Sequence, residues 1–192
     1  MSASSLPLLL LSAAMVVAGL VLPSSQAGDD ARGSRHRPVA AVRAIGQPDR
    51  LVLPSLGIRA PVAPIETSPD GVLTPPAEVD TVGWWQRSAE PGARKGQVLV
   101  TGHTVQQGDG AMDTIGQMKA GDPVLLRSGD RTASYRASDV VVYSRAEIAT
   151  KAHALFGQDR GRGRLVLVTC TDWNGTDYES NIVVFARPVR RA

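Results

Sequence analysis

Short apolar runs, separated by turns that contain glycine or proline, follow one another from about residue 50 to the end of the chain. The clearest run is Leu-Val-Leu-Val-Thr at 165–169, which indicates a strand buried on both faces or nearly so. Gln-Val-Leu-Val-Thr at 97–101 predicts a second buried strand. Further strands or short extended pieces are expected at residues 51–62, 71–73, 82–85, 124–126, 132–136, 140–143 and 181–186.

Two polar patterns predict short helices. Ser144-Arg-Ala-Glu147 is a capping box, which is expected to open a helix that runs to about Leu155. Residues 113–119 predict a shorter helix with Ile115 facing inward and Gly121 ending it. About eight strands with two short helices favour a mainly β fold, a closed or nearly closed barrel. Residues 50–192 are enough for one such domain with a sizeable core.

The first 49 residues read differently. Residues 6–22 are uncharged and almost wholly apolar, which is at the short limit for a membrane span. Ser25-Gln-Ala27 then offers the small residues that a signal peptidase accepts. We expect residues 1–27 to be an export signal or a membrane anchor, with the anchor favoured, and the rest of the chain to lie outside the cytoplasm. Residues 28–49 are polar and arginine-rich, which predicts a flexible tether. Its arginines could touch anionic lipid, although a solvated linker is the favoured interpretation.

Composition removes several classes of function. The net charge is only +3, and no basic run with interleaved aromatic residues is present, so we expect no nucleic-acid partner. One Cys excludes an intramolecular disulfide, and three scattered His with that Cys give no zinc pattern. There is no glycine-rich phosphate loop and no clustering of carboxylates. We therefore predict no metal and no cofactor, and we expect a monomer.

The single thiol is the main candidate for chemistry. Cys170 stands at the end of the predicted strand 165–169 and is followed by a polar loop that contains glycine. A free Cys is often a small buried hydrophobe, and it becomes a candidate nucleophile only when a His can reach it. His103 follows the other buried strand, so the two residues would share one rim if those strands point the same way. His36, in the tether, and His153, in a predicted helix, are weaker candidates.

The pairing of a thiol with an imidazole has a clear chemical use. A thiol has a pKa of about 8.5, so only a few per cent is thiolate at pH 7. A nearby imidazole raises that fraction and can protonate a leaving amine. The tetrahedral intermediate of acyl transfer also needs a donor for its oxyanion, usually worth on the order of 3 kcal/mol.

A set of short motifs connects these residues with a known family. In order along the chain they are Gly83-Trp-Trp, Pro91-Gly, Thr101-Gly-His-Thr, Gly121-Asp, Val168-Thr-Cys-Thr and Tyr178-x-x-Asn-x-Val-Val-x-Ala. This series resembles the sortases of Gram-positive bacteria, and the nearest match is the actinobacterial class E/F-like group. The resemblance covers about residues 50–189. The motifs around His103 and Cys170 are individually weak and jointly specific.

The resemblance implies a sortase-like eight-stranded β-barrel and a membrane-associated cysteine transpeptidase and endopeptidase. Such enzymes cut a sorting signal of the Leu-Pro-any-Thr-Gly type, hold the product as a thioester, and pass it to an amine, commonly of the peptidoglycan precursor. On the matching positions, Cys170 would be the nucleophile and His103 the general acid. The implied partners are surface proteins that bear the sorting signal, an amine acceptor of the cell wall, and the membrane through the N-terminal segment.

One position departs from the family pattern. In the family, the third catalytic residue is an Arg two residues before the Asn that Asn181 matches. In this chain Glu179 occupies the place of that Arg. A carboxylate has the wrong charge for an oxyanion and would tend to raise the pKa of a neighbouring thiol. Asn181, on the same strand face as residue 179, or Arg87 or a loop Arg, could supply the donor instead.

Three interpretations stay open at this level. The favoured one is a sortase transpeptidase. The second is a sortase-fold protein that binds sorting signals or wall material with weak or no turnover because of Glu179. The third is an exported β-barrel of structural role, in which Cys170 and His103 are incidental.

Overall fold

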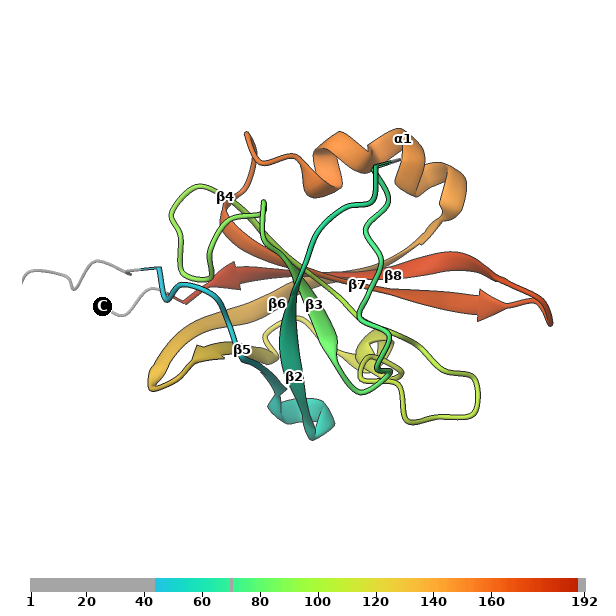
Figure 1. Cartoon of the computed structure of the whole chain (residues 1–192), viewed down its shortest axis with the longest axis horizontal. Coiled ribbons are helices and arrows are strands. Elements are labelled where there is room, and N and C mark those ends of the chain that lie inside the picture. Colours follow the sequence, from blue (N-terminus) through green and yellow to red (C-terminus); the bar gives the residue numbers. More distant parts are fainter. Residues whose placement is uncertain (1–43, 70, 190–192) are drawn as a thin grey trace, which may run out of the picture. The chain divides into compact units, whose positions relative to one another are not determined.

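The computed structural model describes residues 44–69 and 71–189, and in this part of the chain eight strands close into a barrel (Figure 1). The strands are β1 (Arg50–Leu53), β2 (Ile58–Ile65), β3 (Val82–Trp85), β4 (Gly96–Thr101), β5 (Pro123–Ser128), β6 (Arg131–Ser144), β7 (Arg162–Trp173) and β8 (Tyr178–Pro188). Their order around the barrel is β1-β2-β3-β4-β7-β8-β6-β5. The pairs β2–β3 and β4–β7 are parallel, and the others are antiparallel.

The expected β-barrel is confirmed, with differences in how its strands are divided. Residues 132–136 and 140–143 are not two strands but parts of the single strand β6. The strand has an irregularity between Ala137 and Asp139, and it stays paired with β8 on both sides of it. The piece 71–73 forms no strand, and only Leu73 makes an isolated bridge, to Thr67. Proline and glycine around it interrupt a regular ladder.

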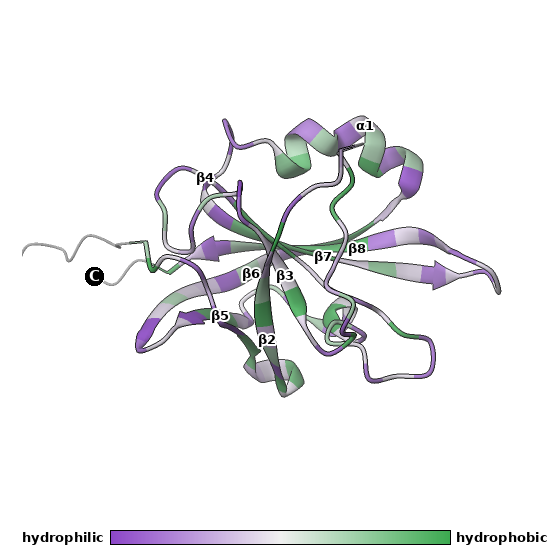
Figure 2. Ribbon diagram, viewed as in Figure 1, coloured by the Kyte–Doolittle hydropathy of each residue, from purple (hydrophilic) through white to green (hydrophobic). Residues whose placement is uncertain are grey.

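Alternation along the strands sorts apolar side chains onto two faces. Leu165 and Leu167 of β7 belong to the cluster that fills the barrel, whereas Val166 and Val168 belong to a smaller cluster on its outer face. The outer cluster also contains Leu155 of the helix α1 (Arg145–Phe156). Figure 2 shows hydrophobic residues concentrated on the central strands, while the β5–β6 turn is hydrophilic. The strand 165–169 is therefore covered on both faces, as predicted.

The helices differ from each other in how well they were predicted. The capping box is present, since the Ser144 hydroxyl accepts from the Glu147 amide and the Glu147 carboxylate accepts from the Ser144 amide. The segment expected to be a short helix at 113–119 contains only the 3-10 turn η2 (Ile115–Gln117), and a second such turn, η1, spans Pro54–Leu56. Asp113 does not start a helix because its carboxylate accepts from the amides of Val105 and Gly110 at 2.7 and 2.9 Å.

The buried Tyr135 gives a test of the barrel interior. Its hydroxyl accepts a hydrogen bond from the Gly92 amide at 2.8 Å, and burial raises its pKa to about 12. We expect Tyr135→Phe to lower the free energy of unfolding by about 1–3 kcal/mol, because it leaves a buried N–H without its partner. A tyrosine of the unfolded chain ionises near pH 10 while the folded one stays neutral, so this group stabilises the fold below pH 10 and that contribution is lost as the pH rises toward 12.

Urea denaturation of both proteins at pH 8 and at pH 11 measures this effect. The gap in stability between the natural protein and Tyr135→Phe should narrow at the higher pH. A gap that stays constant or widens would show that the hydroxyl ionises as readily in the folded state as in the unfolded one.

The apolar segment 6–22 lies outside the described residues, as do most of the expected tether and its arginines. Within residues 44–69 and 71–189, no helix has the length and apolar character needed to cross a bilayer.

Candidate active site

Cys170 lies where its strand loses one of its two neighbours. The sequence placed Cys170 at the strand end, and this was wrong, because β7 continues to Trp173 through its pairing with β8. The neighbouring strand β4 stops at Thr101, whose partner on β7 is Val168. The backbone beyond Val168 is therefore held by β8 alone, and this opens the β4 side of Cys170 to a cleft while the strand stays rigid.

The side chain of Cys170 belongs to the outer face of the barrel. It alternates with Thr169, whose side chain is buried, and continues the row of Val166 and Val168. Asn181 of β8 is its cross-strand partner, and Tyr143 of β6 is in turn the partner of Asn181. The Asn181 amide nitrogen lies 3.8 Å from the Cys170 sulfur and 3.4 Å from the Thr169 carbonyl oxygen. The thiol thus has a potential hydrogen-bond donor directly beside it.

A cavity of about 550 Å³ runs from the thiol between α1 and the connection that follows β2. One end is polar and contains Thr101, Thr169, Cys170 and Asn181. The remainder is mainly apolar, with walls from the β2–β3 connection, the barrel face and α1, namely Val72, Leu73, Pro75, Leu99, Val168, Ile148, Ala149, Ala152 and Phe156. A cavity of this size and character suits an extended peptide segment with small or apolar side chains.

His103 lies at the same end of the barrel as Cys170. Because β4 and β7 are parallel, the residues that follow Thr101 and Val168 leave the sheet at one rim, and this confirms the condition on which the pairing of His103 and Cys170 depended. Gly102 lies between Thr101 and His103 in the chain, and a Cβ added there would lie only 2.9 Å from the Met112 side chain. The close approach of the two side chains stays a prediction.

The hydrogen bond of the imidazole defines its tautomer. Nε2 of His103 lies 2.7 Å from the carbonyl oxygen of Pro76. A carbonyl can only accept, so Nε2 carries the hydrogen, and in the neutral ring Nδ1 is left as an acceptor. An imidazole in this state is suited to take a proton from a thiol.

The loop that contains His103 is hydrogen-bonded to both β7, which contains Cys170, and β8. The hydroxyls of Thr104 and Thr169 are 2.7 Å apart, and the Tyr178 hydroxyl donates to the Thr104 carbonyl at 2.8 Å. Asp113, on the same loop, accepts the amides that close it. The loop is therefore positioned by contacts with β7 and β8 that sequence spacing alone does not reveal.

Electrostatics at the thiol favour the neutral form in the free protein. Burial raises the pKa of Cys170 above its ordinary value, and the Asp177 carboxylate adds to that rise. The Arg145 guanidinium acts in the opposite direction and lowers it. A thiol in such surroundings needs a base before it can attack a carbonyl carbon.

Glu179 does not play the part expected from its sequence position. Its side chain is exposed and accepts a hydrogen bond from the Asn174 amide at 2.9 Å within the β7–β8 turn. The carboxylate whose charge raises the thiol pKa is that of Asp177. Arg87, one of the proposed substitute donors, pairs with Glu66 at 3.1 Å. Arg145 is a charged group near the site that sequence reasoning missed, because its place depends on the pairing of β6 with β8.

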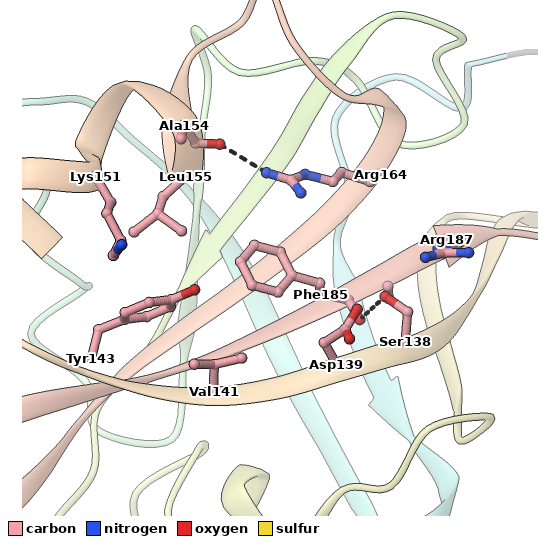
Figure 3. A pocket seen from close by; sticks show the side chains of 11 residues that line it. Ser138, Asp139, Val141, Tyr143, Lys151, Ala154, Leu155, Arg164, Phe185 and Arg187 are labelled. Carbon is pink, nitrogen blue, oxygen red and sulfur yellow. Dashed lines mark hydrogen bonds between the residues drawn. The ribbon is translucent and has the colours of Figure 1, made fainter. Parts of the chain in front are cut away.

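A second cavity, of about 480 Å³, lies on the outer barrel face beside α1 (Figure 3). Arg164 forms one wall, donates to the Ala154 carbonyl at 2.9 Å and to the Gln97 side chain, and places its guanidinium 4.6 Å from the centre of the Phe185 ring. A cation at the last helical turn interacts favourably with the helix dipole. Arg164 thereby fixes the end of α1, whose other side walls the cavity that contains Cys170.

Metal ligands are not gathered anywhere in the part of the chain that the structure describes, where no group of three or more His, Cys, Asp or Glu side chains could hold an ion.

The barrel has its only thiol on β7 and a His after the adjacent parallel strand β4, and a comparison with protein families identifies the family to which it belongs. The sortase domain matches residues 51–189, so the chain belongs to the sortase family. Its general function is accordingly that of a cysteine transpeptidase, which acts on proteins that bear a sorting signal and on amine nucleophiles.

Several solved structures with a similar fold are sortases. Sortase C-1 from Actinomyces oris is 22% identical, with 73% of this chain matching 72% of that one at a TM-score of 0.55. Sortase E1 from Streptomyces coelicolor, solved with a tripeptide in the active site, is 22% identical over 77% of this chain and 91% of its own, at a TM-score of 0.57. Sortase C1 from Streptococcus agalactiae is 16% identical, with 75% of this chain matching 68% of that one at a TM-score of 0.57. No curated protein sequence matches the chain.

Proposed function

We propose that this protein cleaves a sorting signal of the Leu-Pro-any-Thr-Gly type through a thioester on Cys170 and transfers the acyl part to an amine of the cell wall. The observation that supports this most directly is the place of Cys170, at the polar end of a groove whose remaining walls are mainly apolar. An extended peptide with apolar residues ahead of the scissile bond would fill the groove and leave its carbonyl at the thiol.

The proposed reaction has two acyl-transfer steps. The Cys170 thiol gives its proton to His103, and the sulfur attacks the carbonyl carbon of the Thr residue of the signal. The C–N bond to the following Gly breaks, and His103 returns the proton to the leaving amine, so that a thioester remains. An incoming amine then attacks the thioester carbonyl, loses a proton to His103, and releases the thiol.

The amide of Asn181 also takes part in the proposed reaction. The Asn181 amide lies beside the sulfur and is the proposed donor to the oxyanion.

We further propose that the barrel works on the outer side of the membrane, with residues 6–22 as its anchor. Mass spectrometry of the mature protein tests this point, since an N-terminus at Gly28 would show a cleaved signal instead.

The test of the function is to trap the intermediate. The protein is incubated with a Leu-Pro-any-Thr-Gly peptide without an amine acceptor, quenched in acid and weighed by mass spectrometry. We expect an added mass equal to the peptide up to its Thr, because acid preserves thioesters, and no such mass for Cys170→Ala. Hydroxylamine or a glycine peptide, added before the quench, should discharge it.

The outcome also separates the alternatives. Peptide binding to the Cys170→Ala protein, with no adduct on the natural protein, would favour a sortase-fold binding protein. The position of Glu179 is the observation that keeps this second candidate in view. If no peptide of this type binds or forms an adduct, the proposed substrate class is overturned.

A further inference from the structure

Arg145 is the first residue of α1, and strand pairing places the start of this helix at the level of the thiol. Its neighbour Ser144 lies opposite Ser180 of β8, and Ser180 lies opposite Thr171, the residue after Cys170. Only β8 separates β6 from β7. Arg145 therefore leaves β6 at the level of the thiol, within the reach of one long side chain from the mouth of the groove.

The guanidinium of Arg145 reaches over β8 to the β7–β8 turn. Its Nη2 lies 2.5 Å from Oδ1 of Asp177, and the side chains are 59% and 56% exposed. Asp177 is itself fixed, because its amide donates to the Asn174 side chain at 2.9 Å and its carboxylate accepts from the Tyr178 amide at 2.8 Å. An exposed ion pair contributes little to folding stability, so its main effect is the field that it places on the groove.

The charges that face the thiol come from four elements. From α1, the Arg145 charge lowers the pKa of Cys170, and from the β7–β8 turn the Asp177 charge raises it. At the start of β8, the pKa of Tyr178 is raised mainly by burial and then by the Cys170 charge. His103 follows β4 at the same rim. Among the described residues, Arg145 is the cation whose field opposes the effect of burial on the thiol.

We propose that Arg145 is the cation of this active site, which stabilises negative charge on the Cys170 sulfur and on the groups that react with it, and that Asp177 holds its guanidinium at the mouth of the groove and weakens its field. The inference deepens the proposed function, because it assigns the charge that acts on the same thiol. It also explains how a site with Glu at position 179 contains a positive charge, supplied by a different element.

The arrangement has a consequence for substrate binding. A peptide in the groove would exclude water from the space between the guanidinium and the sulfur. The field of Arg145 acts more strongly in the lower dielectric that results. The cation would therefore have its largest effect on the complex and a smaller one on the free protein.

Alkylation of the thiol measures this charge without a substrate. Cys170 is the only cysteine, so the rate of its reaction with iodoacetamide against pH, followed by mass spectrometry of the full chain, reports on one group. We expect Arg145→Gln to raise the thiol pKa and to slow alkylation at pH 7.5 at least about twofold, since a thiolate is the reacting form. Asp177→Asn should lower the thiol pKa and speed alkylation.

The matched control is Arg87→Gln, which removes the same charge from another exposed ion pair, that with Glu66. It should leave the alkylation profile unchanged. Salt at 0.5 M should slow alkylation of the natural protein but not that of the Arg145→Gln protein, in which the Asp177 charge is left to be screened. An Arg145→Gln profile that matches that of Arg87→Gln would overturn the proposal.

The double variant tests the role of Asp177. The Asp177 charge raises the thiol pKa in either background, and Asp177 acts through the guanidinium only when Arg145 is present, so Asp177→Asn should have different effects in the natural and the Arg145→Gln proteins. Equal effects in both would overturn this part, because Asp177 would then act on the thiol directly. Alkylation that depends on Arg145 without any thioester from the sorting peptide would refute the proposed substrate and leave the assignment of the cation intact.

Discussion

Replacement of His103 with Ala should lower kcat/KM for transpeptidation about 10²–10⁴-fold, the range that general acid–base catalysis contributes. The reason is that burial keeps the Cys170 thiol protonated at neutral pH, so the reaction needs a group that removes that proton and returns it to the leaving amine. The hydrogen bond from Nε2 to Pro76 holds the ring with Nδ1 as its acceptor.

Steady-state kinetics with a Leu-Pro-any-Thr-Gly peptide and an amine acceptor measure this loss. His153→Ala is the matched control, because His153 lies on α1 in an exposed pair with Asp159 at 3.3 Å. We expect its activity to stay within about threefold of that of the natural protein. Equal activity of the two variants would mean that another group transfers the proton.

Replacement of Asn181 with Ala should lower kcat about 10²–10³-fold, as expected for the loss of one donor to an oxyanion. Asn181 is the cross-strand partner of Cys170, with its amide nitrogen 3.8 Å from the sulfur, so the oxygen of an acyl group on that sulfur would form close to it. The rate of alkylation of Cys170 should change far less than kcat, because alkylation forms no oxyanion.

Glu179→Gln is the control for this experiment. Glu179 lies on β8 two residues before Asn181, but its carboxylate is engaged by Asn174 in the turn. We expect its removal to change kcat by no more than about threefold. A loss at Glu179→Gln as large as that at Asn181→Ala would show that the charge at position 179 supports the reaction as much as the Asn181 amide does.

Local patterns predicted the parts of this fold that local physics determines. The capping box at Ser144 placed the start of α1 correctly, because both of its hydrogen bonds are made within four residues. The buried strand 165–169 was also predicted correctly, since an apolar run without a break has few other places in a small domain. The motifs around His103 and Cys170 predicted that the two residues share one rim of the barrel, and the parallel pairing of β4 with β7 brings their segments to the same end.

Features that depend on pairing between distant strands could not be read from the sequence. Cys170 was taken for a strand end because the polar residues after it look like a loop, yet Thr171 and Trp173 still pair with β8. Glu179 was assigned an effect on the thiol that belongs to Asp177, since the turn that presents these side chains is organised by Asn174. Arg145 was missed because nothing near it in sequence indicates that β6 lies two strands from β7.

The parallel pairing of β4 with β7 also bears on the order in which the protein folds. Thr101 and Val168 meet although 67 positions separate them, and Asn181 arrives only with β8. Contacts between positions this far apart form slowly, because the entropy of closing the loop is lost before the contact stabilises anything. The pairing of Cys170 with Asn181 lies within the β7–β8 hairpin and is local, whereas the pairing of β4 with β7 joins distant parts of the chain. The arrangement that brings His103 and Cys170 to one rim therefore depends on a long-range contact, which is expected to form late in folding.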